Sequence, residues 1–357
     1  MQLAINIIVT VIISPWFLLF MMSPMMFDAP GSENDKSHII STMLLLCYPI
    51  GVFVLLKLFG WQYFGVNSTK LIIVSAVVIM LGFFMFGYVN ILSNAMKGVA
   101  NSGYSVANGK VYYDARPIDE ADSQSFTLFE EDNNFHRAKY ARDTRHLYYE
   151  GKKIEGVEDV EIERLGDRYN DYWKNNSQII YDGEILKGAR PEYFSIFNDY
   201  DSWSQSDNPD GCIVYHFGKA LSTVDKSSFK VLNQFLAKDK DNIYERTTKI
   251  LSEADAATFS LYGDDHAFGK DKDHVYYLST KTPFVVEGAD VASFKHLERG
   301  YAQDKDSVYH ILQYQTVEKI QQADATTFET TRYDEKTKSE ARDKNYYYYD
   351  GKIVGNR

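Results

Sequence analysis

Cysteine is nearly absent from the sequence, with two residues among 357. Cys47 lies inside an apolar run, and Cys212 stands alone in the polar remainder of the chain. A disulfide framework or a cysteine metal site needs more cysteines at closer spacing. The sequence therefore excludes both.

Recognisable catalytic motifs are also missing. The eight histidines show no His-Glu-x-x-His spacing, and the chain contains no nucleophile elbow and no phosphate-binding loop. We therefore expect a non-enzymatic protein without a cofactor or a metal. One enzymatic alternative stays open, because acidic residues are plentiful and two carboxylates suited to glycoside hydrolysis could meet in the fold.

Basic side chains are outnumbered by acidic ones after residue 96. Residues 1–96 carry equal numbers of acidic and basic side chains, so the net charge of −11 belongs to residues 97–357. A domain this acidic repels phosphate backbones, which argues against nucleic acid as a partner. The 27 tyrosines lie mostly in this acidic part, which favours a folded, strand-rich domain.

Three apolar runs stand out near the N-terminus, at about 5–27, 39–59 and 71–92. Each is nearly free of charge and has the length that a helix needs to cross a bilayer. We predict three transmembrane helices in a membrane anchor over residues 1–96, with the lipid bilayer as their partner. Pro15 and Pro24 are expected to kink the first helix. The run lacks a basic leading segment and a small-residue cleavage site, so we do not expect it to be removed as a signal peptide.

Basic residues near the membrane favour one orientation. Lys57 and Lys70 bracket the loop between the second and third runs, which places that loop in the cytoplasm by the positive-inside rule. The acidic first loop and residues 97–357 then lie outside the cytoplasm.

Residues 97–357 repeat one phrase about eight times, at a spacing of roughly 34 residues. Its clearest copies begin at Asp143, Asp239, Asp271, Asp304 and Asp343, and each has a tyrosine five residues later. Asp-Lys-Asp/Asn suits a turn, and the Val-Tyr-Tyr that follows suits a strand. Asp-Gly or Glu-Gly then predicts a tight turn with positive φ, so each repeat should contain a β-hairpin.

Aspartate pairs in the same phrase allow a calcium alternative. The pairs are Asp239/Asp241, Asp271/Asp273 and Asp304/Asp306. An EF-hand also needs a glycine at its sixth position and a glutamate at its twelfth, and both are missing. Turn formation is therefore the interpretation that we prefer.

A second phrase recurs after the hairpins and ends in phenylalanine. In each of its copies an aspartate stands four residues before the phenylalanine, namely Phe126, Phe229, Phe259, Phe294 and Phe328. The aspartate is placed to cap one helical turn that directs the ring back towards the sheet. We expect this ring to close each repeat.

Stacking of the repeats is expected, because a single hairpin cannot bury its apolar face alone. We predict a mainly β, solenoid-like repeat array over residues 97–357, with a propeller-like closure as the alternative. Tyr148, Tyr244, Tyr276 and Tyr309 occupy one column of it. They form either a partner-binding tyrosine face or a packing column between repeats, and packing is the interpretation that we favour.

The phrase Asp343-Lys344-Asn345-Tyr346-Tyr347 resembles the naming motif of the DKNYY family of bacterial proteins, and the resemblance covers roughly residues 100–357. It implies a bacterial source and brings no known activity to these positions. We expect an integral protein of the bacterial inner membrane that serves as a non-enzymatic interaction module of the envelope. Its repeat surface would bind a protein or a polysaccharide. The alternative is an envelope glycan or peptidoglycan hydrolase.

Overall fold

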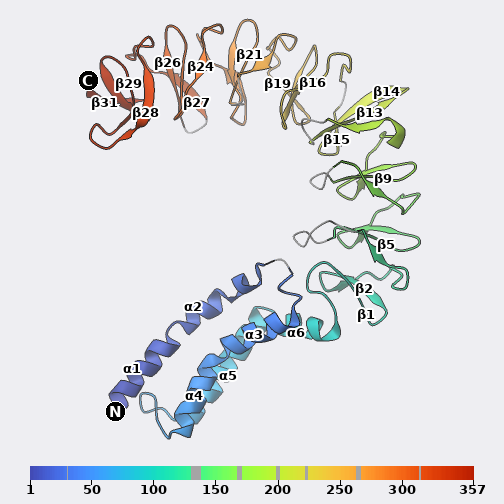
Figure 1. The fold of residues 1–357 in the computed structure, drawn as a ribbon, viewed down its shortest axis with the longest axis vertical. Coiled ribbons are helices and arrows are strands. Elements are labelled where there is room, and N and C mark those ends of the chain that lie inside the picture. The colour runs from blue at the N-terminus through green and yellow to red at the C-terminus, as the bar shows by residue number, and fades with distance from the viewer. Residues whose placement is uncertain are drawn as a thin grey trace. The chain divides into compact units, whose positions relative to one another are not determined.

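The computed structural model describes residues 1–29, 31–129, 138–166, 171–197, 202–221, 224–262, 267–312 and 315–357. The chain forms two compact parts, here called the N-terminal part (Met1–Ile185) and the C-terminal part (Leu186–Arg357). Their boundary lies inside the repeat region and not at residue 96, where the composition changes. Figure 1 shows helices first and then a succession of small sheets.

The N-terminal part begins with helices that end where the acidic sequence starts. They are α1 (Gln2–Ile13), α2 (Trp16–Met21), the 3-10 helix η1 (Ser23–Phe27), α3 (Lys36–Leu46), α4 (Tyr48–Leu58), α5 (Ser68–Met85) and α6 (Tyr88–Lys97).

Breaks between these helices follow the local sequence. Pro15 separates α1 from α2, and the two helices together make one segment, Gln2–Met21, that is long enough to cross a membrane. Pro49 lies in the first turn of α4, where the chain bends by 50° from α3 to α4. Gly87, at φ 75°, ends the run of α5 before residue 92, and α6 starts anew from it.

Two helical segments are long and apolar enough to cross a membrane. A pair of helices joined at a bend is a third if the pair counts as one span. The segments are Gln2–Met21 and Ser68–Met85, and the pair is Lys36–Leu46 with Tyr48–Leu58. Many of their apolar side chains are exposed, including Leu58 (75%) and Phe84 (79%). Exposed apolar surface of this extent is typical of a face that contacts lipid or another protein.

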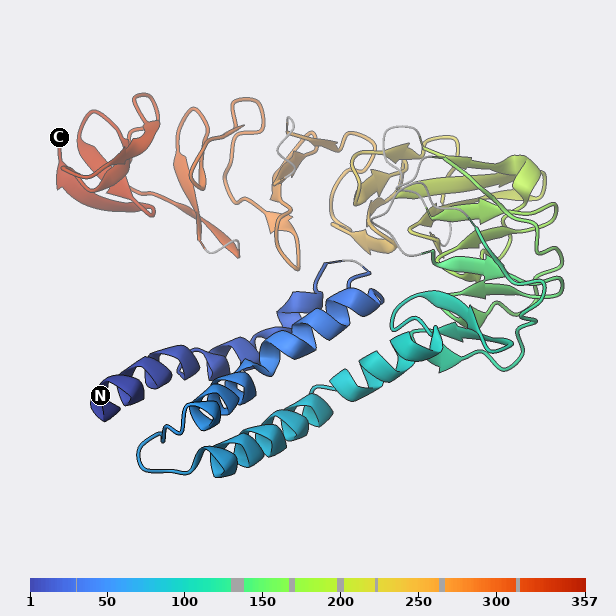
Figure 2. The same ribbon diagram turned by 60° about the horizontal axis from the view of Figure 1, so that its bottom comes forward.

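The helices pack around a small aromatic core. Its centre consists of Phe20, Leu46, Ile79 and Phe83. Beside it, the hydroxyl groups of Tyr88 and Ser23 share a hydrogen bond of 2.5 Å. Helices α4 and α5 lie side by side in both ribbon views (Figure 2).

Hydrogen bonds join the loops at the two ends of the helical region. At one end, the Asn34 side chain accepts from the backbone N–H groups of Asn101 (2.7 Å) and Ser102 (3.1 Å). At the other end, Asn6 accepts from the backbone of Phe64 (3.1 Å), and Gln2 donates to the carbonyl of Gln62 (2.5 Å). The first loop therefore lies beside the start of the repeats, and the second loop lies beside the N-terminus.

The described strands form eight antiparallel sheets, which we number as repeats 1 to 8. Repeats 1 to 3, in the N-terminal part, contain β1 (Tyr104–Ala107), β2 (Lys110–Tyr113), β3 (Arg116–Pro117); β4 (Thr127–Leu128), β5 (Tyr140–Arg142), β6 (Leu147–Tyr149), β7 (Lys152–Lys153); and β8 (Glu163–Arg164), β9 (Tyr172–Lys174), β10 (Ile179–Tyr181), β11 (Glu184–Ile185).

Repeats 4 to 8 belong to the C-terminal part, where the 3-10 helix η2 (Pro191–Tyr193) precedes the first sheet. Their strands are β12 (Phe194–Ile196), β13 (Trp203–Asn208), β14 (Gly211–His216), β15 (Lys219–Ala220); β16 (Lys230–Val231), β17 (Leu236–Lys238), β18 (Ile243–Glu245), β19 (Thr248–Ile250); β20 (Ser260–Leu261), β21 (Phe268–Lys270), β22 (Val275–Tyr277), β23 (Phe284–Val285); β24 (Lys295–His296), β25 (Tyr301–Gln303), β26 (Val308–Leu312), β27 (Thr316–Lys319); and β28 (Glu329–Asp334), β29 (Ser339–Arg342), β30 (Tyr346–Tyr349), β31 (Lys352–Asn356).

The predicted hairpin is present but is only part of each sheet. It corresponds to the last two strands, such as β6 and β7. One further strand precedes the Asp-Lys turn and another follows the phenylalanine, so seven of the eight described sheets have four strands. Repeats of this length hold four strands because most of the strands are two to four residues long.

The predicted turns are confirmed in their backbone geometry. Glu150, Asp182 and Asp350 all have positive φ, as do the glycines that follow them. These pairs form primed turns, which match the twist of the flanking strands.

Each recurring phenylalanine packs between two consecutive sheets. Phe328, for example, lies 5.3 Å from the Tyr301 ring of repeat 7 and 5.4 Å from the Tyr348 ring of repeat 8, measured between ring centroids. Phe259 is buried with Leu236 of repeat 5 and Tyr276 of repeat 6. Within each part, neighbouring repeats therefore share their apolar core, as stacking requires.

Candidate functional site

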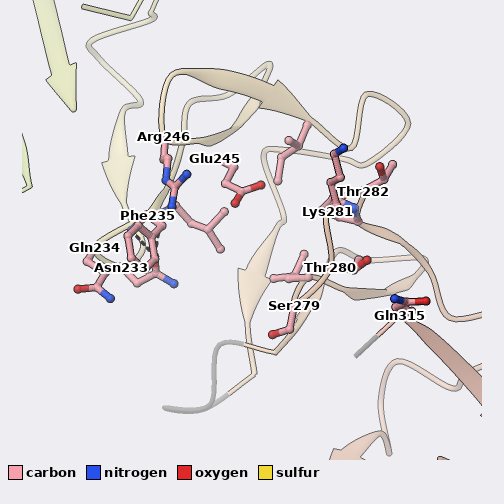
Figure 3. A pocket seen from close by; sticks show the side chains of 14 residues that line it. Asn233, Gln234, Phe235, Glu245, Arg246, Ser279, Thr280, Lys281, Thr282 and Gln315 are labelled. Carbon is pink, nitrogen blue, oxygen red and sulfur yellow. Dashed lines mark hydrogen bonds between the residues drawn. The ribbon is translucent and has the colours of Figure 1, made fainter. Parts of the chain in front are cut away.

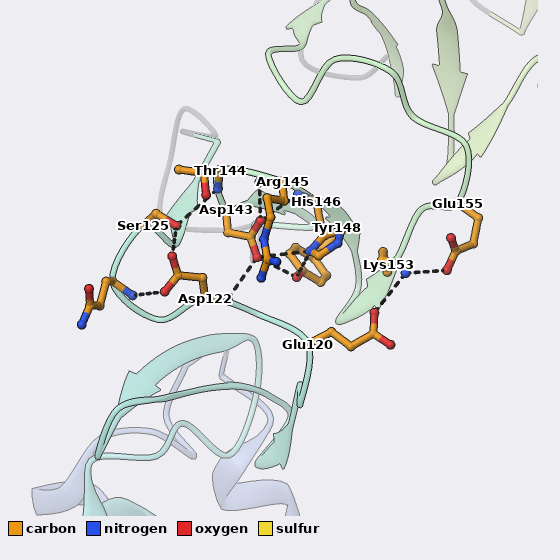
Figure 4. Close-up of polar contacts among 11 residues, drawn as sticks. Glu120, Asp122, Ser125, Asp143, Thr144, Arg145, His146, Tyr148, Lys153 and Glu155 are labelled. Carbon is orange, nitrogen blue, oxygen red and sulfur yellow. Dashed lines mark hydrogen bonds and ion pairs between the residues drawn. The ribbon is translucent and has the colours of Figure 1, made fainter.

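The first aspartate of the repeat phrase is the centre of a buried hydrogen-bond cluster, which we call the aspartate hub. In repeat 2, one oxygen of Asp143 accepts from the backbone N–H groups of Arg145 and His146, both at 2.7 Å. The other oxygen accepts from the Tyr148 hydroxyl (2.9 Å) and from the backbone N–H of Asp122 (3.0 Å) (Figure 4). Every direction from which the carboxylate can accept is used, so its charge can be buried.

The same hub recurs in repeats 5 to 8. It is centred on Asp239, Asp271, Asp304 and Asp343, with the hydroxyls of Tyr244, Tyr276, Tyr309 and Tyr348 at 2.7 to 2.9 Å. In each of these four, the lysine of the phrase pairs with the aspartate that caps the phenylalanine turn, as in Lys272 to Asp255 at 3.0 Å. The hub thus ties the turn before the sheet to the hairpin within it.

The tyrosine column is buried, which corrects one of the two interpretations of it. Tyr148, Tyr244, Tyr276 and Tyr309 are 0%, 1%, 1% and 2% exposed. Their rings pack on the phenylalanines and their hydroxyls donate to the hub carboxylates. They form no surface face for a partner, because the rings are buried and the hydroxyls donate inside the fold.

The aspartate pairs of the phrase do not act together as cation ligands. The first member of each pair is a hub whose oxygens already accept four hydrogen bonds, as Asp271 shows. The second member, such as Asp273, is exposed. In the part of the chain that the structure describes, no group of three or more histidine, cysteine, aspartate or glutamate side chains is arranged to hold a metal ion.

A second interaction, which we call the turn lock, fastens one repeat to the next. The hydroxyl of Tyr140 in repeat 2 accepts from the backbone N–H of Gly183, in the primed turn of repeat 3, at 2.9 Å. Tyr104 holds Gly151 in the same way (2.8 Å), and Tyr301 holds Gly351 (3.0 Å). The locking tyrosine is the first residue of the strand that pairs with the Val-Tyr-Tyr strand, namely β1, β5 or β25, a position that the sequence did not single out.

The turn lock has no tyrosine between repeats 5 and 6. Leu236 occupies the place of the locking tyrosine, since it pairs with Glu245 as Tyr140 pairs with Tyr149. The neighbouring junctions lack the tyrosine too, because Trp203 in repeat 4 and Phe268 in repeat 6 stand at the same position. What distinguishes repeat 6 is the loop 278–283, which stands where repeats 1 to 5 and 8 have a two-residue turn.

A groove of about 960 Å³ opens at this junction. Its lining comes from repeats 5 to 7 and consists of Asn233, Gln234, Phe235, Leu236, Glu245, Arg246, Ile250, Leu278, Ser279, Thr280, Lys281, Thr282, Pro283 and Gln315 (Figure 3). The volume lies in the range usual for ligand sites. We call it the binding groove, and the loop 278–283 supplies six of its fourteen lining residues.

Arg246 and Phe235 form one rim of the binding groove. Arg246 has a φ of 55° at a turn position, and its guanidinium lies 5.2 Å from the centroid of the Phe235 ring. A cation held over an aromatic face keeps its own donors directed outwards.

Several polar side chains of the groove make no hydrogen bond or ion pair with the described residues. They are those of Gln234, Glu245, Ser279, Thr280, Lys281, Thr282 and Gln315. The hubs, by contrast, leave no carboxylate oxygen without a donor. Uncommitted polar groups above apolar side chains are what a binding site needs.

The alternative of a hydrolase requires two separated carboxylates, and the neighbouring pair Asp171 and Asp182 does not supply them. Burial raises the pKa of Asp171, as does its hydrogen bond to Asp182. Lys139 lies 3.0 Å from Asp171 and 3.7 Å from Asp182. Glycoside hydrolysis needs carboxyl groups roughly 5 to 9.5 Å apart. Two carboxyls that bond to each other leave no room for a sugar between them.

Comparison with known proteins identifies a family. The model of the DKNYY family matches residues 104–280 and, in a second overlapping match, residues 210–352. No curated protein shows significant similarity to the chain. No solved structure does either. The family match spans the sheets of repeats 1 to 8 and includes the hubs, the turn locks and the binding groove. The chain belongs to the DKNYY family.

Proposed function

We propose that this protein is a non-enzymatic binding module of the bacterial envelope, held in the membrane by its N-terminal helices and carrying its partner site in the binding groove. The observation behind the proposal is the groove itself. It occurs where the repeat pattern is broken, and it gathers polar groups that the fold does not use.

Three membrane crossings fit the contacts of the helical region better than two. Asn34 in the first loop bonds to Asn101 and Ser102, so these residues lie on one side of the membrane. A chain that returns to the same side must cross an even number of times in between. Helix α5 supplies one crossing, and the bent pair α3–α4 must supply the other.

This arrangement puts the repeats opposite the N-terminus. The loop 60–67 lies with the N-terminus, in keeping with the bonds from Phe64 to Asn6 and from Gln2 to Gln62. Lys57 and Lys70 flank that loop, so the positive-inside rule favours a cytoplasmic loop and an extracytoplasmic repeat domain. We propose that the repeats form an open, solenoid-like array there.

The partner site is tested by site-specific photo-crosslinking in living cells. A photoreactive amino acid is placed at Lys281 inside the groove, or at Lys319 on β27 as the matched control. We expect a discrete adduct, of either protein or glycan, from the Lys281 position alone. Equal labelling from both positions, or none from either, would sink the proposal.

A further inference from the structure

The binding groove carries features that suit one class of ligand. We propose that it binds an acidic glycan, a polysaccharide segment whose sugar rings carry carboxylate groups. This inference rests on the function proposed above, because it assigns a ligand to the same groove.

The first argument is hydrogen-bonding capacity. Gln234, Thr280 and Thr282 offer both donors and acceptors, and none bonds to another described side chain. A sugar presents several hydroxyls that each donate and accept, so it pairs with amide and hydroxyl groups in any rotation. An apolar ligand would leave these groups without partners.

The second argument is the apolar surface between them. Leu236, Ile250, Leu278 and Pro283 line the groove, and Phe235 is 37% exposed at its rim. One face of a sugar ring consists of C–H groups and packs on such side chains. Phe235 supplies the largest of these contacts.

Charge is the third argument. Arg246 and Lys281 line the groove, and Glu245 is the one carboxylate among the described residues that line it, although the chain as a whole carries a net charge of −11. Within a screening length of about 8 to 10 Å, the two cations attract a carboxylate despite the acidic surroundings. The planar guanidinium of Arg246 matches a carboxylate group in two parallel hydrogen bonds.

An extended peptide fits less well. A peptide that adds to a sheet needs a free strand edge along the groove. Strand β19 forms an edge of its sheet, yet Thr248 and Lys249 are not among the described residues that line the groove, and Ile250 is. The groove therefore follows little of this free strand edge.

Calorimetry on the full-length chain in lipid nanodiscs tests the inference. The probes are a uronic-acid oligosaccharide and the same oligosaccharide after reduction of its carboxyl groups. We expect the acidic form to bind roughly tenfold more tightly, because it adds a charge-assisted pair. Arg246→Gln should abolish that preference, and Lys319→Gln, outside the groove, should leave it intact.

Three results would overturn the inference. Equal affinity for the two probes would show that the carboxylate groups of the ligand do not contribute to binding. Binding of neither probe, together with a polypeptide adduct from the Lys281 crosslinker, would replace the glycan with a protein and leave the proposed function standing. Binding of neither probe and no adduct would remove both.

Discussion

At the scale of single residues, the aspartate hub explains why the repeat phrase contains aspartate and tyrosine together. Asp271 is 4% exposed and keeps its charge because four donors face it, one of them the Tyr276 hydroxyl. Repeat 3 shows the dependence in its own sequence. There Asn175 replaces the aspartate and Ile180 replaces the tyrosine, so the acid is lost together with the hydroxyl.

Removal of the hub charge should destabilise a repeat. In Asp271→Asn, an amide N–H₂ replaces one carboxylate oxygen and cannot accept hydrogen bonds. The Tyr276 hydroxyl and the backbone N–H of Asp255, which both donate to one oxygen of Asp271, then lose their acceptor. We expect a loss of about 2 to 3 kcal/mol of unfolding free energy. Hydrogen exchange of the backbone N–H groups of repeat 6 measures this loss of stability locally.

Asp273→Asn in the same turn is the matched control, because that side chain is exposed. Equal exchange in the two variants would show that the hub does not stabilise the repeat.

Acid should unfold the repeats over a defined range of pH. Burial favours a raised pKa for Asp143, but the N–H groups of Asp122 and Arg145 and the Tyr148 hydroxyl lower it to about 2. The same kinds of contact lower the pKa values of Asp239, Asp271 and Asp343. A carboxyl with a lowered pKa in the fold stabilises it above the unfolded value of about 3.9 and loses this effect as the pH falls.

Near-ultraviolet circular dichroism of the buried tyrosines should therefore stay constant from neutral pH to about 4 and decline between about 4 and 2. A decline complete by pH 5 would contradict a role for the hubs.

At the scale of elements, the turn lock explains why glycine follows the acid in the primed turn. A Cβ atom on Gly183 would lie 2.5 Å from the Tyr149 ring of the preceding repeat. Repeat 1 has no repeat before it, and its turn carries Ala115 at a φ of 60°. Glycine is thus needed for the close approach as well as for its backbone freedom.

Two alanine substitutions separate these effects. Gly183→Ala and Gly109→Ala both place a side chain at positive φ, but only Gly183 has atoms within 4 Å of the new Cβ. We expect roughly 1 kcal/mol of destabilisation at Gly109 and about 1 to 3 kcal/mol more at Gly183. Thermal melts of the two variants compare them. Equal losses would show that the contact between repeats contributes nothing.

The sequence predicted the hairpin, its primed turn and the phenylalanine that packs between repeats. It did not predict four strands, because segments such as Leu236–Lys238 are too short to show alternation. Nor did it predict the groove, which depends on the loop 278–283. The hub was readable only in part. An aspartate and a tyrosine five residues apart disappear together at Asn175 and Ile180, but Asp210 and Tyr215 keep that spacing without forming a hub, since Asp210 is exposed and Tyr215 donates to the carbonyl of Lys187.

At the scale of the whole molecule, the proposed topology rests on whether the chain crosses the membrane an even or an odd number of times. The contacts of Asn34 require an even number of crossings before Asn101, whichever way the protein faces. If the bent pair were a re-entrant loop, Asn34 and Asn101 would lie on opposite sides.

Cysteine labelling in intact membranes checks the topology. After replacement of Cys47 and Cys212, single cysteines are placed at Ser32, Gly65 and Asp241. We expect an impermeant reagent to label the Ser32 and Asp241 positions from one side and the Gly65 position only from the other. Labelling of all three from one side would contradict three crossings.

The central claim is that the groove lined by the loop 278–283, between repeats 5 and 6, is the partner site. Its most direct test is to close the groove, either by replacing the loop 278–283 with Asp-Gly or, without altering the backbone, by Thr280→Trp. Affinity for the crosslinked partner is then measured for each variant whose melting temperature shows that it is folded. The account predicts that binding is lost while the repeats stay folded; unchanged affinity in a folded variant would contradict it.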